Sequence, residues 1–276
     1  MKRIVTIQDI SCVGKCSLTV ALPIISTMGV EAAVIPTAVL STHTAFSGFT
    51  FRDLTDDIMP VADHWKKENM DFSAIYTGYL GSEKQLGITS EIFDTFKSKQ
   101  TLILVDPVMA DNGVLYKGFT QEFADKMAAL CGKADIIVPN LTEASFMLHT
   151  PYIESYDEAY IRDMLKKLCG LGAKVSVLTG VSFEEGKIGV MSYDSPTGRY
   201  FSYFRERIPV SFHGTGDVFA SALLGALMNN KGLDESLKIS VDYTVECIAL
   251  TLADSDRRWY GVNFESAIPY LIDRLK

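Results

Sequence analysis

Apolar residues along this chain alternate between short continuous runs and longer stretches with helical spacing. The short runs predict strands, and the stretches with apolar positions three or four residues apart predict helices. The expected strands span 3–8, 32–40, 74–79, 101–105, 135–138 and 174–179, and 187–194 with 200–205 forms a hairpin around a Ser-Pro-Thr-Gly turn. The expected helices span 17–28, about 61–68, 82–97, a segment within 120–131, 142–149, 156–171, 216–230, 234–252 and 264–275.

The alternation of strands and helices predicts an α/β fold. Its centre is a doubly wound, mainly parallel sheet flanked by helices. The chain has no linker, repeat or low-complexity segment, so we expect a single domain over residues 1–276. Ligands bind at the carboxyl ends of the strands in such sheets, which makes the residues just after each strand the first candidates for function.

Composition and charge exclude several classes of partner. The 276 residues are 47% hydrophobic and 22% charged, as in an ordinary globular protein. The formal net charge of −8 and the lack of a basic run exclude nucleic acid and anionic membranes as expected partners. The amino terminus lacks a signal-peptide hydrophobic region, and no stretch reaches ~18 apolar residues, so we expect a cytoplasmic protein.

Acidic residues follow several of the expected strands. Asn140 and Glu143 stand three apart at a helix start, where they suit Mg²⁺ or form a capping box. Asp106 and Asp111, in DPVMADNG, fit an acidic site or a plain turn equally well. Asp9 ends an apolar strand and either caps a turn or has a functional partner.

Two further stretches carry candidate chemistry. His43, between Thr42 and Thr44, fits a loop hydrogen bond or a ligand contact. In FHGTGDVFASALL a glycine-rich turn runs into Asp217 and then into a helix. The backbone N–H groups of the turn can hold a phosphoryl group, and the carboxylate can accept a proton from a hydroxyl. The alternative is that Asp217 only favours the helix dipole.

Together these motifs resemble the ribokinase-like kinases and, within them, the pyridoxal kinase branch. The matching segments are IQD at 7–9, STHT at 41–44, GYLGS at 78–82, DPVMADNG at 106–113, PNLTEA at 139–144 and GTGDVFASALL at 214–224. Only residues 10–16 separate the first strand from the first helix, which is too short for the β-lid that sugar kinases of this superfamily insert.

The resemblance implies ATP-dependent phosphorylation of a hydroxymethyl group on a pyridine ring, with Mg²⁺ as cofactor. It places Asp217 as catalytic base and Gly214, Thr215 and Gly216 as the anion hole for the γ-phosphate. Asn140, Asp106 and, through water, Glu143 would organise the metal and the phosphates. Further nucleotide contacts would come from Thr179, Ile208 and Pro209, and contacts to the vitamer from Asp9, His43, Thr44 and Tyr79.

The resemblance also leaves alternatives open. Many pyridoxal kinases have Ser where Asp9 stands, so an acceptor with a protonated ring nitrogen or an amine is a hypothesis for this chain. A hydroxymethylpyrimidine kinase is the nearest alternative, and a non-catalytic nucleotide or vitamin sensor a more distant one. Relatives are often dimers, so we expect a homodimer, and the sequence leaves the need for a monovalent cation open.

Overall fold

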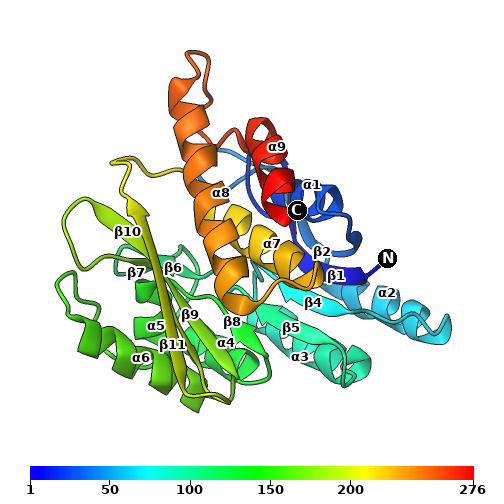
Figure 1. Cartoon of the computed structure of the whole chain (residues 1–276). Helices are drawn as coiled ribbons and strands as arrows, with labels where there is room; N and C mark the ends of the chain where they lie inside the picture. The colour runs from blue at the N-terminus through cyan, green and yellow to red at the C-terminus, as the bar shows by residue number, and fades with distance from the viewer.

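A nine-stranded sheet forms the centre of the fold in the computed structural model, which describes residues 1–276 (Figure 1). The strand order is β11-β10-β9-β8-β5-β4-β1-β2-β3. These strands are β1 (Arg3–Val13), β2 (Glu31–Thr42), β3 (Phe51–Asp53), β4 (Ala74–Thr77), β5 (Leu102–Val105), β8 (Ile136–Ile137), β9 (Val175–Val181), β10 (Lys187–Asp194) and β11 (Arg199–Glu206). The six strands from β2 to β9 in this order are parallel, and β3 and the β10–β11 hairpin add antiparallel pairs at the two ends.

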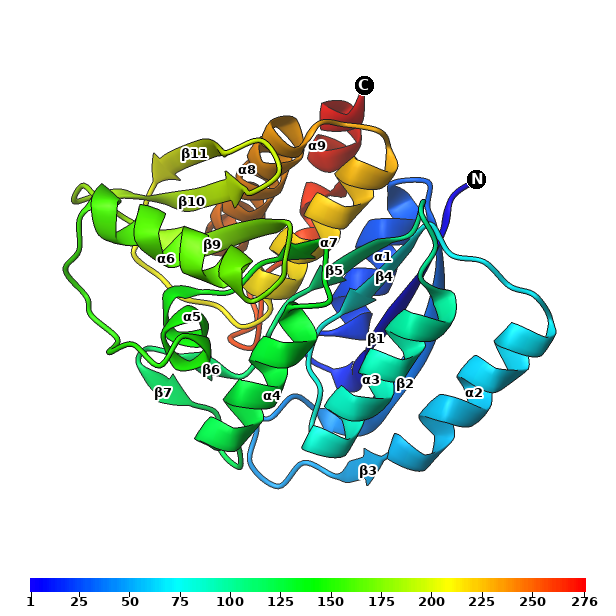
Figure 2. The ribbon, with the colours of Figure 1, turned by 90° about the horizontal axis from the view of Figure 1, so that it is seen from below.

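Helices cover both faces of this sheet, as the two views show (Figures 1 and 2). One face carries α2 (Thr55–Lys67), α3 (Glu83–Phe96), α4 (Gln121–Cys131), α5 (Leu141–Met147) and α6 (Glu158–Gly170). The other carries α1 (Leu18–Thr27), α7 (Thr215–Met228), α8 (Leu233–Ala253) and α9 (Phe264–Leu275). The predicted fold class is confirmed. None of the helices has the length and apolar character that crossing a bilayer requires.

Helix α7 lies against the middle of the sheet and has apolar residues on nearly all sides. Phe219 and Leu223 pack into the same buried cluster as Tyr76 of β4 and Leu104 of β5. Val218, on another side of α7, packs with residues of α1, α8 and α9. Because its flanks are buried against the sheet and other helices, α7 is fixed along its length, and its first turn is held at the carboxyl edge of the strands.

The first strand is longer than the sequence pattern predicts. We expected it to end before Asp9, but β1 continues to Val13 and stays paired with β2 through Ser11↔Leu40 and Val13↔Thr42. The register between the two strands shifts near Asp9. The polar residue therefore interrupts the apolar pattern without ending the strand, because the backbone pairing continues past the irregularity.

Two other differences concern short or interrupted segments. Helix α2 begins at Thr55, well before the expected start near residue 61, and contains Pro60. Burial of Ile58 and Ala62 holds the helix together across the proline, which lacks an N–H donor. Strand β3 and the separate β6 (Ala110–Asp111) and β7 (Val114–Leu115) pair were not predicted, because two or three residues are too few to show a period.

Candidate active site

Most predicted site residues lie at the carboxyl edge of the parallel strands, around the first turn of α7. Gly214 precedes this helix in a left-handed conformation, with φ of 79°. A side chain there would also overlap the Lys15 carbonyl oxygen, so this close approach requires glycine. The amides of Thr215 and Gly216 come before the first intrahelical bond, which joins Val218 N to the Gly214 carbonyl. They are therefore available to an anion.

Asp217 follows directly in this first turn and is half-buried. Its Oδ2 accepts a hydrogen bond from the Ser17 amide at 2.9 Å, and its other oxygen has no hydrogen bond within the protein. Burial raises the pKa of Asp217 to about 7, the Ser17 amide lowers it in part, and the charge of Asp9 raises it further. A carboxyl group with this pKa and one free oxygen can accept a proton near neutral pH.

Asp106 and Glu143 are buried close to Asp217. Burial, then the charges of Glu143 and Asp217, raise the pKa of Asp106 well above its ordinary value. Burial also raises the pKa of Glu143 to about 8. Asp111, the other member of the predicted acidic pair, is the exposed last residue of β6 and accepts hydrogen bonds from Asn112. Asp106 is therefore the buried member of that pair, whereas Asp111 is exposed, although its charge adds to the rise in the pKa of Glu143.

Asn140 and Glu143 form the capping box that we weighed against a metal site. Asn140 Oδ1 accepts from the Glu143 amide at 2.9 Å, and Glu143 Oε2 accepts from the Asn140 amide at 2.8 Å. Glu143 Oε1 accepts from the Met109 amide, and Asn140 Nδ2 donates to the Ala110 carbonyl. The capping interpretation is confirmed, and the pair also holds the segment after β5 against the start of α5.

The acidic residues at this edge fit a divalent cation that arrives with phosphates. No basic side chain is among the groups that shift the pKa of Asp106, Glu143 or Asp217, so their charges lack a cationic partner. No group of three or more His, Cys, Asp or Glu side chains is placed to hold a metal alone. Mg²⁺ commonly keeps several waters and uses one or two carboxylates plus substrate phosphates, which agrees with this arrangement. The metal roles of Asn140, Glu143 and Asp106 stay predictions.

Asp9 lies near Asp217, and Tyr79 lies near Asp9. Asp9 is buried, accepts a hydrogen bond from Ser11 Oγ at 3.0 Å, and is also bonded by the Ser17 side chain. Burial raises the pKa of Asp9. Burial and the nearby charge of Asp9 raise the pKa of Tyr79. Asp9 and Tyr79 are therefore near one another, and their roles toward an acceptor stay predictions.

His43 is held by two hydrogen bonds in the connection after β2. Its Nδ1 accepts from the Ala45 amide at 3.2 Å, which assigns the proton to Nε2 and lets Nε2 donate to the Tyr260 carbonyl at 3.0 Å. Burial lowers the pKa of His43, in keeping with a neutral ring. The loop hydrogen-bonding interpretation is confirmed. Thr44 is exposed in the same connection, and no hydrogen bond fixes its side chain.

The three further residues predicted to contact a nucleotide make no hydrogen bond to the carboxylates. Thr179 of β9 is half-buried and bridges to Asn140, and its hydroxyl donates to the Pro139 carbonyl at 3.4 Å. Ile208 is half-buried and Pro209 is exposed in the connection from β11 to α7. Their roles toward a nucleotide stay predictions.

Three residues of the site were not anticipated from the sequence. The Ser17 amide holds Asp217, and Cys16 lies close by. Burial and then the charges of Asp217 and Asp9 raise the pKa of the Cys16 thiol to about 12, so it remains protonated. Tyr116 is close to the carboxylates, because Glu143 and Asp106 contribute to the rise of its pKa after burial. No motif marks these residues, since only the fold brings them to the site.

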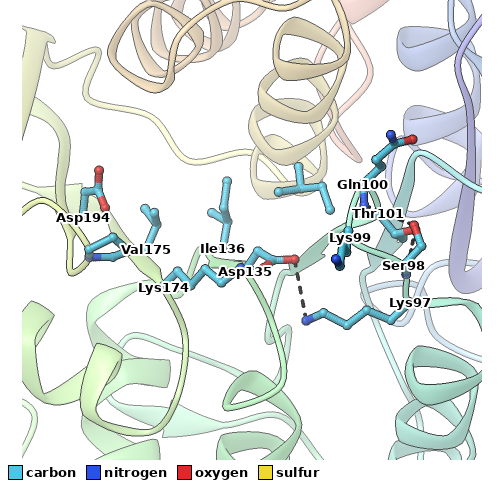
Figure 3. Close-up of a pocket in the computed structure, with 12 residues that line it drawn as sticks. Lys97, Ser98, Lys99, Gln100, Thr101, Asp135, Ile136, Lys174, Val175 and Asp194 are labelled. Carbon is cyan, nitrogen blue, oxygen red and sulfur yellow. Dashed lines mark hydrogen bonds and ion pairs between the residues drawn. The ribbon is translucent and has the colours of Figure 1, made fainter.

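A separate hollow of about 620 Å³ lies at the opposite edge of the sheet (Figure 3). It is lined by residues before β5, β8 and β9, including three lysines. Lys174 pairs with Asp135 at 2.7 Å, and Lys97 lies 3.8 Å from the same carboxylate. None of the predicted site residues borders this hollow, so it is not the candidate active site.

Comparisons with known proteins agree with this geometry. The model of a family described as phosphomethylpyrimidine kinase matches residues 21–257. The structure of a candidate phosphomethylpyrimidine kinase from Bacteroides thetaiotaomicron is 37% identical, with a TM-score of 0.95 over 98% of this chain and 93% of that chain. An orthorhombic crystal form of that protein, with pyridoxal, gives a TM-score of 0.93 over 98% of this chain and 95% of that chain.

Pyridoxal kinases are similar over nearly the whole chain. The crystal structure of the Lactobacillus plantarum enzyme is 29% identical, with a TM-score of 0.90 over 99% of this chain and 97% of that chain. The pyridoxal kinase of Arabidopsis thaliana is 25% identical over 270 residues, 94% of this chain and 85% of the relative. The resemblance to ribokinase-like kinases of the pyridoxal kinase branch is confirmed.

Proposed function

This chain belongs to the phosphomethylpyrimidine kinase family, and from that premise we propose that it is an ATP-dependent pyridoxal kinase. It transfers the γ-phosphate to the hydroxymethyl group of pyridoxal, pyridoxine or pyridoxamine. The observation that carries the proposal is the first turn of α7, where free amides adjoin the free oxygen of Asp217. Similarity to pyridoxal kinases and to a protein crystallised with pyridoxal supports this acceptor class.

In this proposal the two sides of α7's first turn have separate tasks. The free oxygen of Asp217 accepts the proton of the acceptor hydroxyl, whose oxygen then attacks phosphorus in line. The amides of Gly214, Thr215 and Gly216 donate to the phosphoryl oxygens as their charge develops. Asp106 and, through water, Glu143 would hold Mg²⁺ beside the phosphates, with Asn140 fixing Glu143. The bound metal would supply positive charge to the phosphate oxygens.

A hydroxymethylpyrimidine kinase is the second candidate, and the buried carboxylate of Asp9 is the observation that favours it. An ionised Asp9 would accept a hydrogen bond from an aminopyrimidine or from a protonated pyridine nitrogen. Its raised pKa also lets it donate when protonated. Asp9 therefore discriminates among acceptors in either reaction.

A panel of acceptors tests both candidates. ADP release is measured with pyridoxal, pyridoxine, pyridoxamine and hydroxymethylpyrimidine, for the wild type and for Asp9→Ser. We expect kcat/KM to be highest for a pyridine acceptor and the ranking to change with Asp9→Ser. A preference for the pyrimidine would select the second candidate, and an unchanged ranking would contradict the role of Asp9. No turnover with any of the four would refute the kinase proposal.

The family resemblance also supports three finer proposals. Turnover requires Mg²⁺ and is lost with EDTA and restored by added metal. The active form is a homodimer, which sedimentation of the purified protein can measure. Residues 1–276 form one domain, because helices from both ends of the chain pack on the same sheet.

A further inference from the structure

The connection between α8 and α9, residues 254–263, presents an exposed tryptophan. Trp259 is 59% exposed, whereas the other tryptophan, Trp65, packs against Phe72 at the edge of the buried core. The Trp259 ring lies 4.5 Å from the ring of Phe46, measured between centroids. An exposed aromatic ring that also packs on a second ring has contact area left for a ligand.

This connection is attached directly to the acceptor side of the candidate site. The Tyr260 carbonyl accepts the hydrogen bond from His43 Nε2, and the His43 ring lies 5.0 Å from that of His213. His213 immediately precedes Gly214 and the first turn of α7. The Trp259 ring is itself 6.0 Å from the ring of His43. Trp259 therefore stands beside a histidine that links the connection to the candidate base.

A second contact, between Gly261 and Lys15, also joins the α8–α9 connection to the candidate site. Gly261 lies against Lys15, so closely that a Cβ there would overlap the Lys15 side chain. The Lys15 carbonyl in turn lies against Gly214. Lys15 Nζ also donates to Asn263 at 3.2 Å and to Glu265 at 2.7 Å. The α8–α9 connection is thus packed onto the segment that runs from β1 to Ser17 and Asp217.

Hydrogen bonds join the two ends of the α8–α9 connection. Asn263 donates from its side chain to Asp254 at 2.8 Å and from its amide to Thr251 at 2.7 Å. These bonds join the end of α8 to the start of α9 and close the base of the loop. Figure 1 shows the connection leaving the end of α8 and turning back to α9. The loop that carries Trp259 is therefore closed at its base, and the Trp259 ring packs on Phe46.

We propose that Trp259 is an acceptor-binding residue whose exposed face contacts the flat nitrogen heteroaromatic ring of the substrate. The inference rests on the proposed function and assigns a role to a part of the chain outside all the recognised motifs. Trp259 and Phe46 form an aromatic wall on the His43 side, and Tyr79 and Asp9 border the acceptor from the other. The wall selects flat aromatic acceptors over sugar alcohols of similar size.

Steady-state kinetics provide the first test. Trp259→Ala raises the KM for the acceptor about tenfold, as expected for loss of one ring contact, with kcat and the KM for ATP within about twofold. Trp259→Phe restores most of the acceptor affinity. Met70→Ala, which truncates another partly exposed apolar residue between α2 and β4, leaves all three constants unchanged. An unchanged acceptor KM in Trp259→Ala, or parallel losses in all constants, would overturn the proposal.

Fluorescence separates this inference from the kinase proposal, since it needs no turnover. The chain has two tryptophans, so Trp65→Phe leaves Trp259 as the sole reporter and Trp259→Phe leaves Trp65. Titration with pyridoxine and with hydroxymethylpyrimidine, without ATP and corrected against free tryptophan, should change the emission of the first variant in a saturable way and not that of the second. Turnover without this change would refute the role of Trp259 alone. A saturable change without turnover would refute only the kinase step.

Discussion

At the scale of single residues, Asp217 combines one occupied oxygen and one free oxygen in the same carboxylate. The Ser17 amide fixes the orientation of the group, and burial keeps its pKa near neutrality, at about 7. A base that is too acidic would hold a proton weakly, and one that is too basic would already be protonated. The environment of Asp217 therefore suits it to accept a proton from a hydroxyl.

We predict that Asp217→Asn lowers kcat by about 10²- to 10⁴-fold, the contribution usual for general-base catalysis. The amide keeps the size of the side chain, so binding of ATP should remain within a few-fold of the wild type. Rapid-quench or coupled ADP assays give kcat, and equilibrium dialysis gives the nucleotide affinity. Turnover close to that of the wild type would rule out Asp217 as the base.

The same residue predicts how the rate depends on pH. With a pKa of about 7, Asp217 is mostly deprotonated above pH 8 and mostly protonated below pH 6. We therefore expect kcat to be constant at high pH and to fall about tenfold per pH unit below 6, because only the deprotonated carboxylate accepts a proton. Measurements from pH 5 to 9 with saturating substrates test this. A kcat that stays constant from pH 5 to 9 would contradict a base that titrates near pH 7.

The residues with the candidate chemistry were identifiable from the sequence, since carboxylates and amides after strands meet at one edge. Asp106 and Glu143 were placed in this way, and the structure brings them together with Asp217. The groups that surround these residues were not identifiable from the sequence. The Ser17 amide is a backbone group without a side-chain signature, and Trp259 comes near His43 only because the fold brings the α8–α9 connection there.

At the scale of elements, the capping box of α5 connects helix stability with site geometry. Asn140 caps the helix through Oδ1 and fixes the Ala110 carbonyl through Nδ2. Thr120 caps α4 by the same kind of bond, from the Phe123 amide, but away from the carboxylates. The two caps therefore use the same kind of hydrogen bond, one beside the carboxylates and one away from them.

We predict that Asn140→Ala and Thr120→Ala each lower the free energy of unfolding by about 1 kcal/mol, the usual cost of losing a cap. Urea unfolding at pH 7 measures this cost. Only Asn140→Ala should also raise the KM for ATP at limiting Mg²⁺, by about threefold or more, since it releases Glu143 and the segment after β5. An equal effect of both variants on that KM would show that Asn140 acts through stability alone.

Most elements were predictable because their apolar period is clear over ten or more residues. The failures share a physical reason: backbone pairing or burial overrode a local signal. Asp9 interrupted the pattern of β1, yet pairing with β2 continued, and Pro60 suggested a boundary inside α2. The two-residue strands β6 and β7 pair only with each other and carry no apolar pattern, unlike the equally short β8, which lies in the predicted apolar run 135–138.

At the scale of the whole molecule, several carboxyl groups with raised pKa values converge on one edge of the sheet. Burial is the largest cause for Asp9, Asp106, Glu143 and Asp217, and the charges of neighbouring carboxylates add to it for the last three. At neutral pH, ionising these buried carboxyl groups therefore costs free energy in the folded protein without ligands. A bound metal ion with its phosphates would reduce that cost. The cost comes from these carboxyl groups together and not from any single contact.

We predict that this cost appears in the pH dependence of stability. A carboxyl whose folded pKa lies above its unfolded value binds more protons when folded, so stability falls as pH rises through that window. For Asp217 the window runs from its ordinary value of 3.8 to about 7. Asp217→Asn should raise the free energy of unfolding on the order of 2 kcal/mol at pH 8 and by less at pH 5.

Urea unfolding of the ligand-free protein at both pH values measures this effect. Asp63→Asn, an exposed substitution on α2, serves as the control and should change stability similarly at pH 5 and pH 8. If Asp217→Asn behaves like this control, then ionisation of Asp217 carries no folding cost.

The hydrogen bond from Ser17 to Asp217 joins positions 200 residues apart, with a consequence for synthesis of the chain. All strands of the main sheet lie before residue 207, whereas α7, α8 and α9 follow them in the chain and are synthesised later. Until then one face of the sheet lacks Phe219, Leu223 and their neighbours. A nascent chain therefore has all strands of the main sheet before the candidate base and the amides around it, so the candidate site forms only after α7 has been synthesised.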